Sequence, residues 1–159
     1  MLIELRTGVI GLLVAAVPAI AQERTPPTPA ADISCSIGHP VREVSALDQM
    51  PSSIVQFMAS HAGGMAGRGA FFNDTDVIFQ PAPMRRFIRA SEYRNQWFLA
   101  YETGGIAYSR RVALFETDPK AKTARPLGMS YYFNSNACVL IDKMLDGEVS
   151  SKSLQAAYW

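Results

Sequence analysis

The chain has 159 residues, of which 48% are hydrophobic, and its 15 basic and 14 acidic residues leave a formal net charge of +1. Nucleic-acid-binding domains concentrate Lys and Arg, so this near-neutral balance argues against nucleic acid as the main partner. It does not exclude small anionic ligands or one local basic patch.

Residues 1–21 have the pattern of a secretory signal peptide. A short segment with one Arg precedes the apolar run Gly8–Val17, and Ala19-Ile20-Ala21 fits the small-x-small cleavage pattern. The apolar run is too short to span a bilayer comfortably, since a spanning helix needs roughly 20 residues. We therefore expect an exported protein, periplasmic or extracellular, whose mature form begins at Gln22 and has no transmembrane span.

Cleavage leaves about 138 residues, enough for one domain with a hydrophobic core. Residues 22–32 contain three prolines, which remove backbone donors and favour extended polyproline geometry, so we predict a flexible leader. Residues 33–159 are predicted to form a single domain, starting with a short strand or extended arm over Ile33–Val41.

The chain has two cysteines, Cys35 and Cys138, and in an exported protein the pair predicts one disulfide. Two alternatives remain open at this point: two unpaired buried thiols, or a reactive thiol near His39 or His61. Cys35 and His39 are too few for a structural zinc site, which needs four ligands, and we predict no metal site.

A helix is predicted from Pro51 to the Gly63-Gly64 pair, after a short helical turn over Val44–Gln49. Pro suits the first turn of a helix, where its missing N–H costs nothing, and Gly commonly ends one. The residues that recur at helical spacing are Ile54, Phe57, Met58 and His61.

The stretch Gly63–Gly69 is rich in glycine but lacks the Gly-Lys-Ser/Thr of a phosphate-binding loop, so it predicts a flexible connection. Arg68 within it keeps an anion contact open. Phe71-Phe72 and Val77–Phe79 are predicted as short strands around a polar turn.

Residues Arg86–Glu116 are rich in aromatic and branched side chains and predict three consecutive antiparallel strands, divided at Arg94-Asn95 and Thr103–Gly105. On the middle strand Trp97, Leu99 and Tyr101 share one face, and Phe98, Ala100 and Glu102 share the other. Strict alternation on the third strand points Arg110 inward. Either a bulge near Arg110-Arg111 resets the register, which we favour, or a partly buried guanidinium has a partner.

Alternating apolar residues predict a fourth strand over Leu127–Asn134. A helix follows from about Ala137 to Gly147, capped by Ser135 or Asn136, and one more helical turn is predicted at 153–158. The fold class is therefore α+β: an antiparallel sheet of about four to five strands, with one or two helices packed on one face. The other face would be exposed to solvent or covered by a partner.

The common catalytic patterns are missing: there is no Gly-x-Ser-x-Gly, no His-Glu-x-x-His and no phosphate-binding loop. We assign no catalytic residue and no cofactor, and favour a protein that is not an enzyme. The alternative is a small exported hydrolase that uses a thiol, such as Cys35 with His39, or a carboxylate pair, such as Glu92 with Glu102.

Arginine and aromatic residues, the types enriched at binding hot spots, concentrate on the predicted strands. The candidate binding residues are Arg68, Arg86, Arg89, Arg94, Arg110, Arg111, Tyr93, Trp97 and Tyr101. The leading hypothesis is an exported, periplasmic binding or inhibitory module that recognises a protein or anionic glycan of the cell envelope through this sheet face. Alternatively the arginines pair with nearby glutamates and only solvate the sheet. A small-ligand carrier is a further alternative.

Overall fold

The computed structural model describes residues 30–76, 81–120 and 122–149. The predicted signal peptide, most of the Pro-rich leader, the strand expected at Val77–Phe79 and the helical turn expected at 153–158 lie outside these residues. Within them, no helix is long and apolar enough to cross a membrane.

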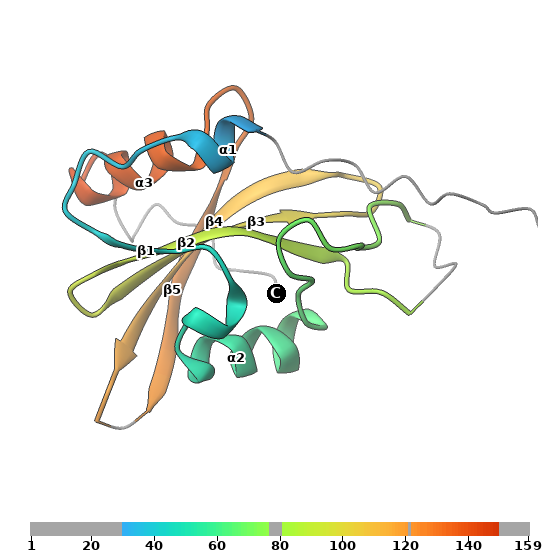
Figure 1. Cartoon of the computed structure of the whole chain (residues 1–159), viewed down its shortest axis with the longest axis horizontal. Coiled ribbons are helices and arrows are strands. Elements are labelled where there is room, and N and C mark those ends of the chain that lie inside the picture. The colour runs from blue at the N-terminus through green and yellow to red at the C-terminus, as the bar shows by residue number, and fades with distance from the viewer. Residues whose placement is uncertain (1–29, 77–80, 121, 150–159) are drawn as a thin grey trace, which may run out of the picture.

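The sheet has five antiparallel strands in the order in which they occur along the chain, which confirms the predicted sheet. The strands are β1 (Arg42–Val44), β2 (Arg85–Tyr93), β3 (Gln96–Thr103), β4 (Ser109–Asp118) and β5 (Thr123–Tyr132). Short turns join β2 to β3 and β4 to β5, whereas a helix and a long connection separate β1 from β2 (Figure 1).

Both faces of the sheet are covered, so the prediction that helices pack on one face only is wrong. Helix α2 (Ser52–Ala62) packs on the face that carries Trp97, Leu99 and Tyr101. Helix α3 (Ala137–Leu145) packs on the face of Phe98 and Ala100, on the opposite side of the sheet in Figure 1. The reason is visible in β3, where both alternating sets are mostly apolar, as in a strand that is buried on both sides.

Helix α2 forms where it was predicted. Its residues Ile54, Met58 and Ala62, spaced by four, are buried against the sheet. Gly63, at φ 67°, ends the helix in the left-handed conformation that favours glycine. The predicted helical turn before α2 is also present, as the 3-10 helix η1 (Leu47–Gln49).

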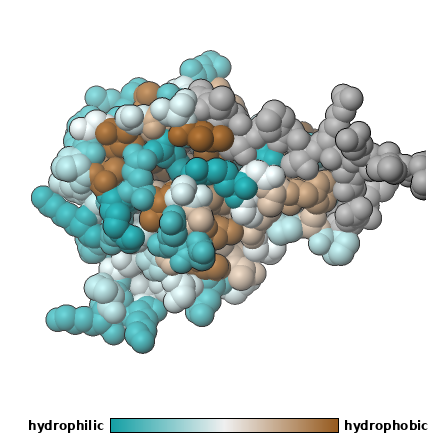
Figure 2. Space-filling view, in the orientation of Figure 1, coloured by the Kyte–Doolittle hydropathy of each residue, from teal (hydrophilic) through white to brown (hydrophobic). Residues whose placement is uncertain are grey.

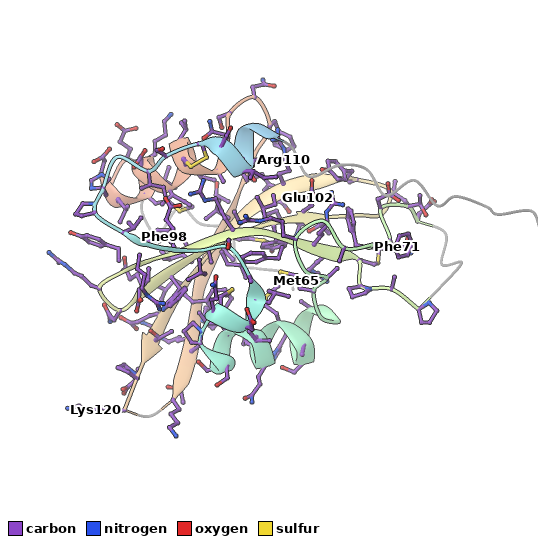
Figure 3. All side chains as sticks on the ribbon, in the orientation of Figure 1. Met65, Phe71, Phe98, Glu102, Arg110 and Lys120 are labelled. Carbon is purple, nitrogen blue, oxygen red and sulfur yellow. A yellow bond between two sulfur atoms is a disulfide. The ribbon has the colours of Figure 1, made fainter. Side chains whose placement is uncertain are left out.

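Helix α3 is capped by Asn136, one of the two residues predicted for this position. Its side chain accepts a hydrogen bond from the Val139 N–H at 3.1 Å. The buried residues Ala137, Leu140 and Ile141 attach it to the sheet. Figure 3 shows the labelled Phe98 between α3 and the sheet.

An N-terminal arm runs along α3 and is fixed to it at several points. The arm begins with α1 (Ala30–Ser34), which includes the last three residues of the predicted leader. Asp32 is fully buried and accepts from the N–H of Ala137 at 2.7 Å. Gly38 donates to Asp142, and the predicted disulfide between Cys35 and Cys138 is present. Of the two forms predicted for Ile33–Val41, a short strand or an extended arm, no strand is present, and the first strand, β1, follows these residues.

The register differs from the prediction around Arg110. There is no bulge there; β2 has an irregularity between Phe87 and Arg89, and β4 has one between Leu114 and Phe115. Arg110 therefore points to the α3 face, as strict alternation requires, and forms an ion pair with Asp32.

Two further boundaries differ. Strand β5 begins at Thr123 rather than Leu127, because its polar first half pairs with β4 as far as Asp118. Phe71-Phe72 is not a strand; Phe72 is instead buried beneath the guanidinium of Arg86.

Candidate anion-binding site

The candidate arginines divide between the two faces of the sheet. On the α3 face, one row across the strands consists of Arg86, Glu102, Arg110 and Tyr132. The Nε of Arg86 donates to Glu102 at 2.7 Å, and both side chains are almost completely buried. The hydroxyl of Tyr108 donates to the other carboxylate oxygen of Glu102 at 2.6 Å. The charges of Arg86 and Glu102 are therefore paired with each other inside the protein.

Arg110 and Arg89 also have internal partners. Arg110 pairs with Asp32 at 2.8 Å and donates to the Phe133 carbonyl, and Figure 3 shows it beside α1. Arg89 pairs with Glu43 and lies within 3.0 Å of both sulfur atoms of the disulfide. Arg89 and Arg110 thus link the arm and α3 to the sheet, whereas Arg86 pairs within the sheet and covers Phe72. The three guanidinium groups are therefore not available as one open binding surface.

The buried row also affects the tyrosines beside it. Burial raises the pKa of Tyr108, and its hydrogen bond to Glu102 raises it further. Burial likewise raises the pKa of Tyr132, with the charge of Asp32 as the next cause. Both phenols therefore stay neutral well above the ordinary tyrosine range.

On the other face, six polar or aromatic side chains meet in two adjacent rows without a carboxylate among them. We call this set the arginine patch; its members are Arg85, Tyr101, Thr103, Ser109, Arg111 and Tyr131. It lies at the C-terminal end of α2, because Arg85 donates to the carbonyl of Ala62, the last residue of that helix.

Arg111 is held in place by neutral groups. Its Nε donates to the Ser109 hydroxyl at 3.1 Å, and its guanidinium lies 4.7 Å from the centre of the Tyr131 ring. The hydroxyl of Tyr101 lies 3.5 Å from the sulfur of Met129, towards which Arg111 also points. Within the described part of the chain, no acidic side chain forms an ion pair with Arg111 or Arg85.

Two polar atoms in the patch are buried and lack a hydrogen-bond partner among the described residues: the Nε of Arg85 and the hydroxyl of Thr103. Burial lowers the pKa of Arg85; Tyr101 opposes this shift, whereas the charge of Arg111 adds to it. Burial raises the pKa of Tyr101, which the two arginines oppose. Two like charges thus share one partly buried region, an arrangement that a bound anion would stabilise.

The remaining candidates lie elsewhere. Arg68 donates to the Ile88 carbonyl at 2.6 Å. Arg94 lies over the Tyr93 ring at the turn between β2 and β3. Trp97 is buried in the core beneath α2 and is covered by Arg42.

Only Tyr101 and Arg111 of the predicted set therefore come together in the arginine patch. Our sequence-based site omitted Arg85, Thr103, Ser109 and Tyr131. Alternation along each strand could have shown which face each of these residues lies on. Only the pairing register between strands shows which of them are neighbours.

No group of three or more His, Cys, Asp or Glu side chains that could hold a metal ion is found in residues 30–76, 81–120 and 122–149. No protein-family model, curated protein or solved structure matches the chain.

Proposed function

We propose that the chain is a small exported binding or inhibitory module that recognises an anionic group on a protein or glycan of the cell envelope through the arginine patch. The observation that carries this proposal is the pair Arg85 and Arg111, two guanidinium groups without a carboxylate, beside buried polar atoms that lack partners among the described residues. Export is inferred from the signal-peptide pattern of residues 1–21, and the disulfide is consistent with it.

The chemistry of the patch suits a carboxylate or sulfate. A guanidinium group presents paired N–H donors that match two oxygens of such an anion. The hydroxyls of Thr103 and Ser109 add donors, and the Tyr131 ring limits the positions that Arg111 can take. Partial burial strengthens each of these interactions relative to water.

The test compares Arg111→Gln with Arg125→Gln, which removes the same charge from an exposed pair with Glu116. Binding of a sulfated polysaccharide and of an acidic peptide is measured by calorimetry at low and moderate salt. We expect Arg111→Gln to weaken binding by about tenfold, or about 1.4 kcal/mol, and Arg125→Gln to change it little. Equal effects of the two substitutions, or no binding by the unmodified protein, would contradict the proposal.

The hydrolase alternative receives little support from the geometry. Cys35 and Cys138 are joined in the disulfide, so neither is a free nucleophile. Glu92 pairs across the strands with Trp97 and Glu102 with Arg86, which places the two carboxylates on opposite faces of the sheet. They cannot act together on one bond.

The carrier alternative would need an apolar cavity. One pocket between α2, η1 and the sheet is lined by Met50, Met58, Met65 and Leu99 among others, and Figure 3 shows Met65 on the α2 side. Its volume is about 200 Å³, below the roughly 300–1,000 Å³ of typical ligand pockets. We therefore do not adopt this function.

A further inference from the structure

A second, larger pocket of about 420 Å³ lies at the opposite end of α2 from the arginine patch. It is bounded by the first turn of α2, by the β2–β3 turn and by the β4–β5 turn. Its lining residues include Arg42, Ser52, Ser53, Arg94, Trp97 and Lys122. We call it the α2 N-terminal pocket. In Figure 2, hydrophilic side chains project at the lower left, the region where Figure 3 labels Lys120 in the β4–β5 turn.

The helix end at this pocket offers free donors. The N-cap position is Pro51, which provides no side-chain cap, and the first turn has no acidic residue. The backbone N–H groups of Ser52 and Ser53 have no helical acceptor, because the first N–H groups of any helix lack one. Neither serine hydroxyl forms a hydrogen bond within the described part of the chain. Oxyanions bind at such helix ends.

Trp97 gives an independent indication of a missing acceptor. It lines the pocket, only 1% of it is exposed, and its indole N–H is buried without a hydrogen-bond partner among the described residues. A buried N–H that is left unpaired is costly, so a ligand oxygen in the pocket would satisfy it. Arg42 covers the ring at 4.9 Å and is itself neutralised by Glu92 at 2.7 Å.

The two remaining cations occupy unusual backbone positions. Arg94 (φ 58°) and Lys122 (φ 53°) are the only residues other than glycine with positive φ in the described chain. Asn or Gly is preferred at such turn positions, because a larger side chain is strained there. Both turns carry instead a long basic side chain at the rim of the same pocket, and neither forms an ion pair among the described residues.

We propose that the α2 N-terminal pocket binds a phosphate or sulfate ester of a small molecule that carries hydroxyl groups. The tetrahedral oxyanion lies at the N–H groups of Ser52 and Ser53, with Arg94 and Lys122 as its counter-charges. The carboxylates of Glu92 and Asp118, which also line the pocket, accept hydrogen bonds from hydroxyls of the ligand. The volume suits a body of monosaccharide size. This site shares no residue with the arginine patch, so it stands or falls separately.

The binding experiment uses calorimetry with a hexose 6-phosphate, the free hexose, inorganic phosphate and sulfate. We expect the phosphate ester to bind more tightly than phosphate or sulfate alone, and the free hexose to give no signal. If the free ions bound as tightly as the phosphate ester, the oxyanion site would be supported, but the assignment of an organic ester would be overturned. No binding of any of the four would overturn the site.

Two variants test the residues without disturbing the fold. Ser52→Pro removes one N–H and one hydroxyl at the first helical position, where proline is favoured and where Pro51, at ψ 130°, already has the conformation that precedes a proline. The double variant Arg94→Gly with Lys122→Gly removes both charges and relieves both strained positions. Each is expected to keep the melting temperature of the unmodified protein while weakening binding of the phosphate ester by about tenfold or more.

Lys143→Gln, on the exposed side of α3, is the control for a change in net charge and should bind normally. The Arg111→Gln variant should also bind the ester normally, since Arg111 belongs to the arginine patch. Unchanged affinity in Ser52→Pro or in the double variant would contradict the placement of the oxyanion. A loss of affinity in Lys143→Gln equal to that of the double variant would show that net charge alone is responsible.

Discussion

At the scale of single residues, Gly104 holds together two segments that are distant in sequence. It follows β3 and is buried against the loop of Asn73 and Asp74. A Cβ at this position would lie 2.0 Å from the Asn73 carbonyl oxygen and 2.5 Å from the Asp74 Cα. The N–H of Gly104 donates to the Met84 carbonyl at 2.8 Å, which fixes this close approach just before β2. The contact is backbone on both sides, so neither segment can yield by a rotamer change.

Gly104→Ala should therefore lower the free energy of unfolding by about 1–3 kcal/mol or more, the range for overpacking of a tight contact. Urea denaturation measures this loss. Gly67→Ala is the matched control, because no atom lies within 4 Å of the place that its Cβ would take and its φ is not in the left-handed region. The control should change stability by less than about 0.5 kcal/mol. Equal stability of the two variants would show that the loop moves away freely.

At the scale of elements, the arm and α3 form one unit that is stapled by the disulfide. The disulfide joins residues 103 positions apart, and Asp32, Gly38 and His39 add polar contacts along α3. The disulfide acts mainly on the unfolded chain, whereas each polar contact acts only in the folded one. The two kinds of link can therefore be distinguished by how much the free energy of unfolding falls when each is removed.

The double substitution Cys35→Ala with Cys138→Ala should lower the free energy of unfolding by about 2–5 kcal/mol, as expected for a native disulfide that closes a long loop. Asp142→Asn, which keeps an oxygen acceptor for the Gly38 N–H, should cost less than about 1 kcal/mol. Thermal and urea denaturation, with and without reductant, provide the comparison. If the double substitution cost no more than Asp142→Asn, the arm would be held by its polar contacts alone.

The sequence predicted the elements better than their arrangement. Both long helices, their glycine and asparagine ends, and the three central strands followed from local periodicity and capping. The partner of Arg110 did not, because Asp32 is 78 residues away in the chain and looked like part of a leader. The candidate binding residues were chosen by type and proximity in sequence. Alternation then divided them between two faces, and three of the arginines have their charge used in internal ion pairs.

At the scale of the whole molecule, one sheet separates two hydrophobic clusters. The cluster under α2 contains Ile54 and Trp97, and the cluster under α3 contains Phe98 and Ile141. Strand β3 contributes to both clusters, so the loss of either cluster would expose one side of a strand whose other side is still packed. A sheet with one open face would lack this coupling. The sequence-based fold had one open face because β3 was interpreted as a half-exposed strand. Nearly every residue of β3 is in fact buried.

This coupling predicts a single cooperative unfolding transition. Ile54→Ala and Ile141→Ala, one in each cluster, should each lower the free energy of unfolding by about 2–5 kcal/mol. The two losses should add to within about 0.5 kcal/mol in the double variant, because the side chains lie on opposite faces. Trp97 fluorescence in a Trp159→Phe background, which leaves Trp97 as the single tryptophan, and far-UV circular dichroism follow the two variants in urea.

The informative case is Ile141→Ala, because the reporter Trp97 lies on the other face. In one cooperative unit, this substitution must move the fluorescence transition by the full amount that circular dichroism records. A fluorescence transition that stays in place while circular dichroism shows an earlier one would mean that α3 and the arm unfold independently. The arginine patch and the α2 N-terminal pocket, both on the α2 side, would then remain formed after α3 is lost.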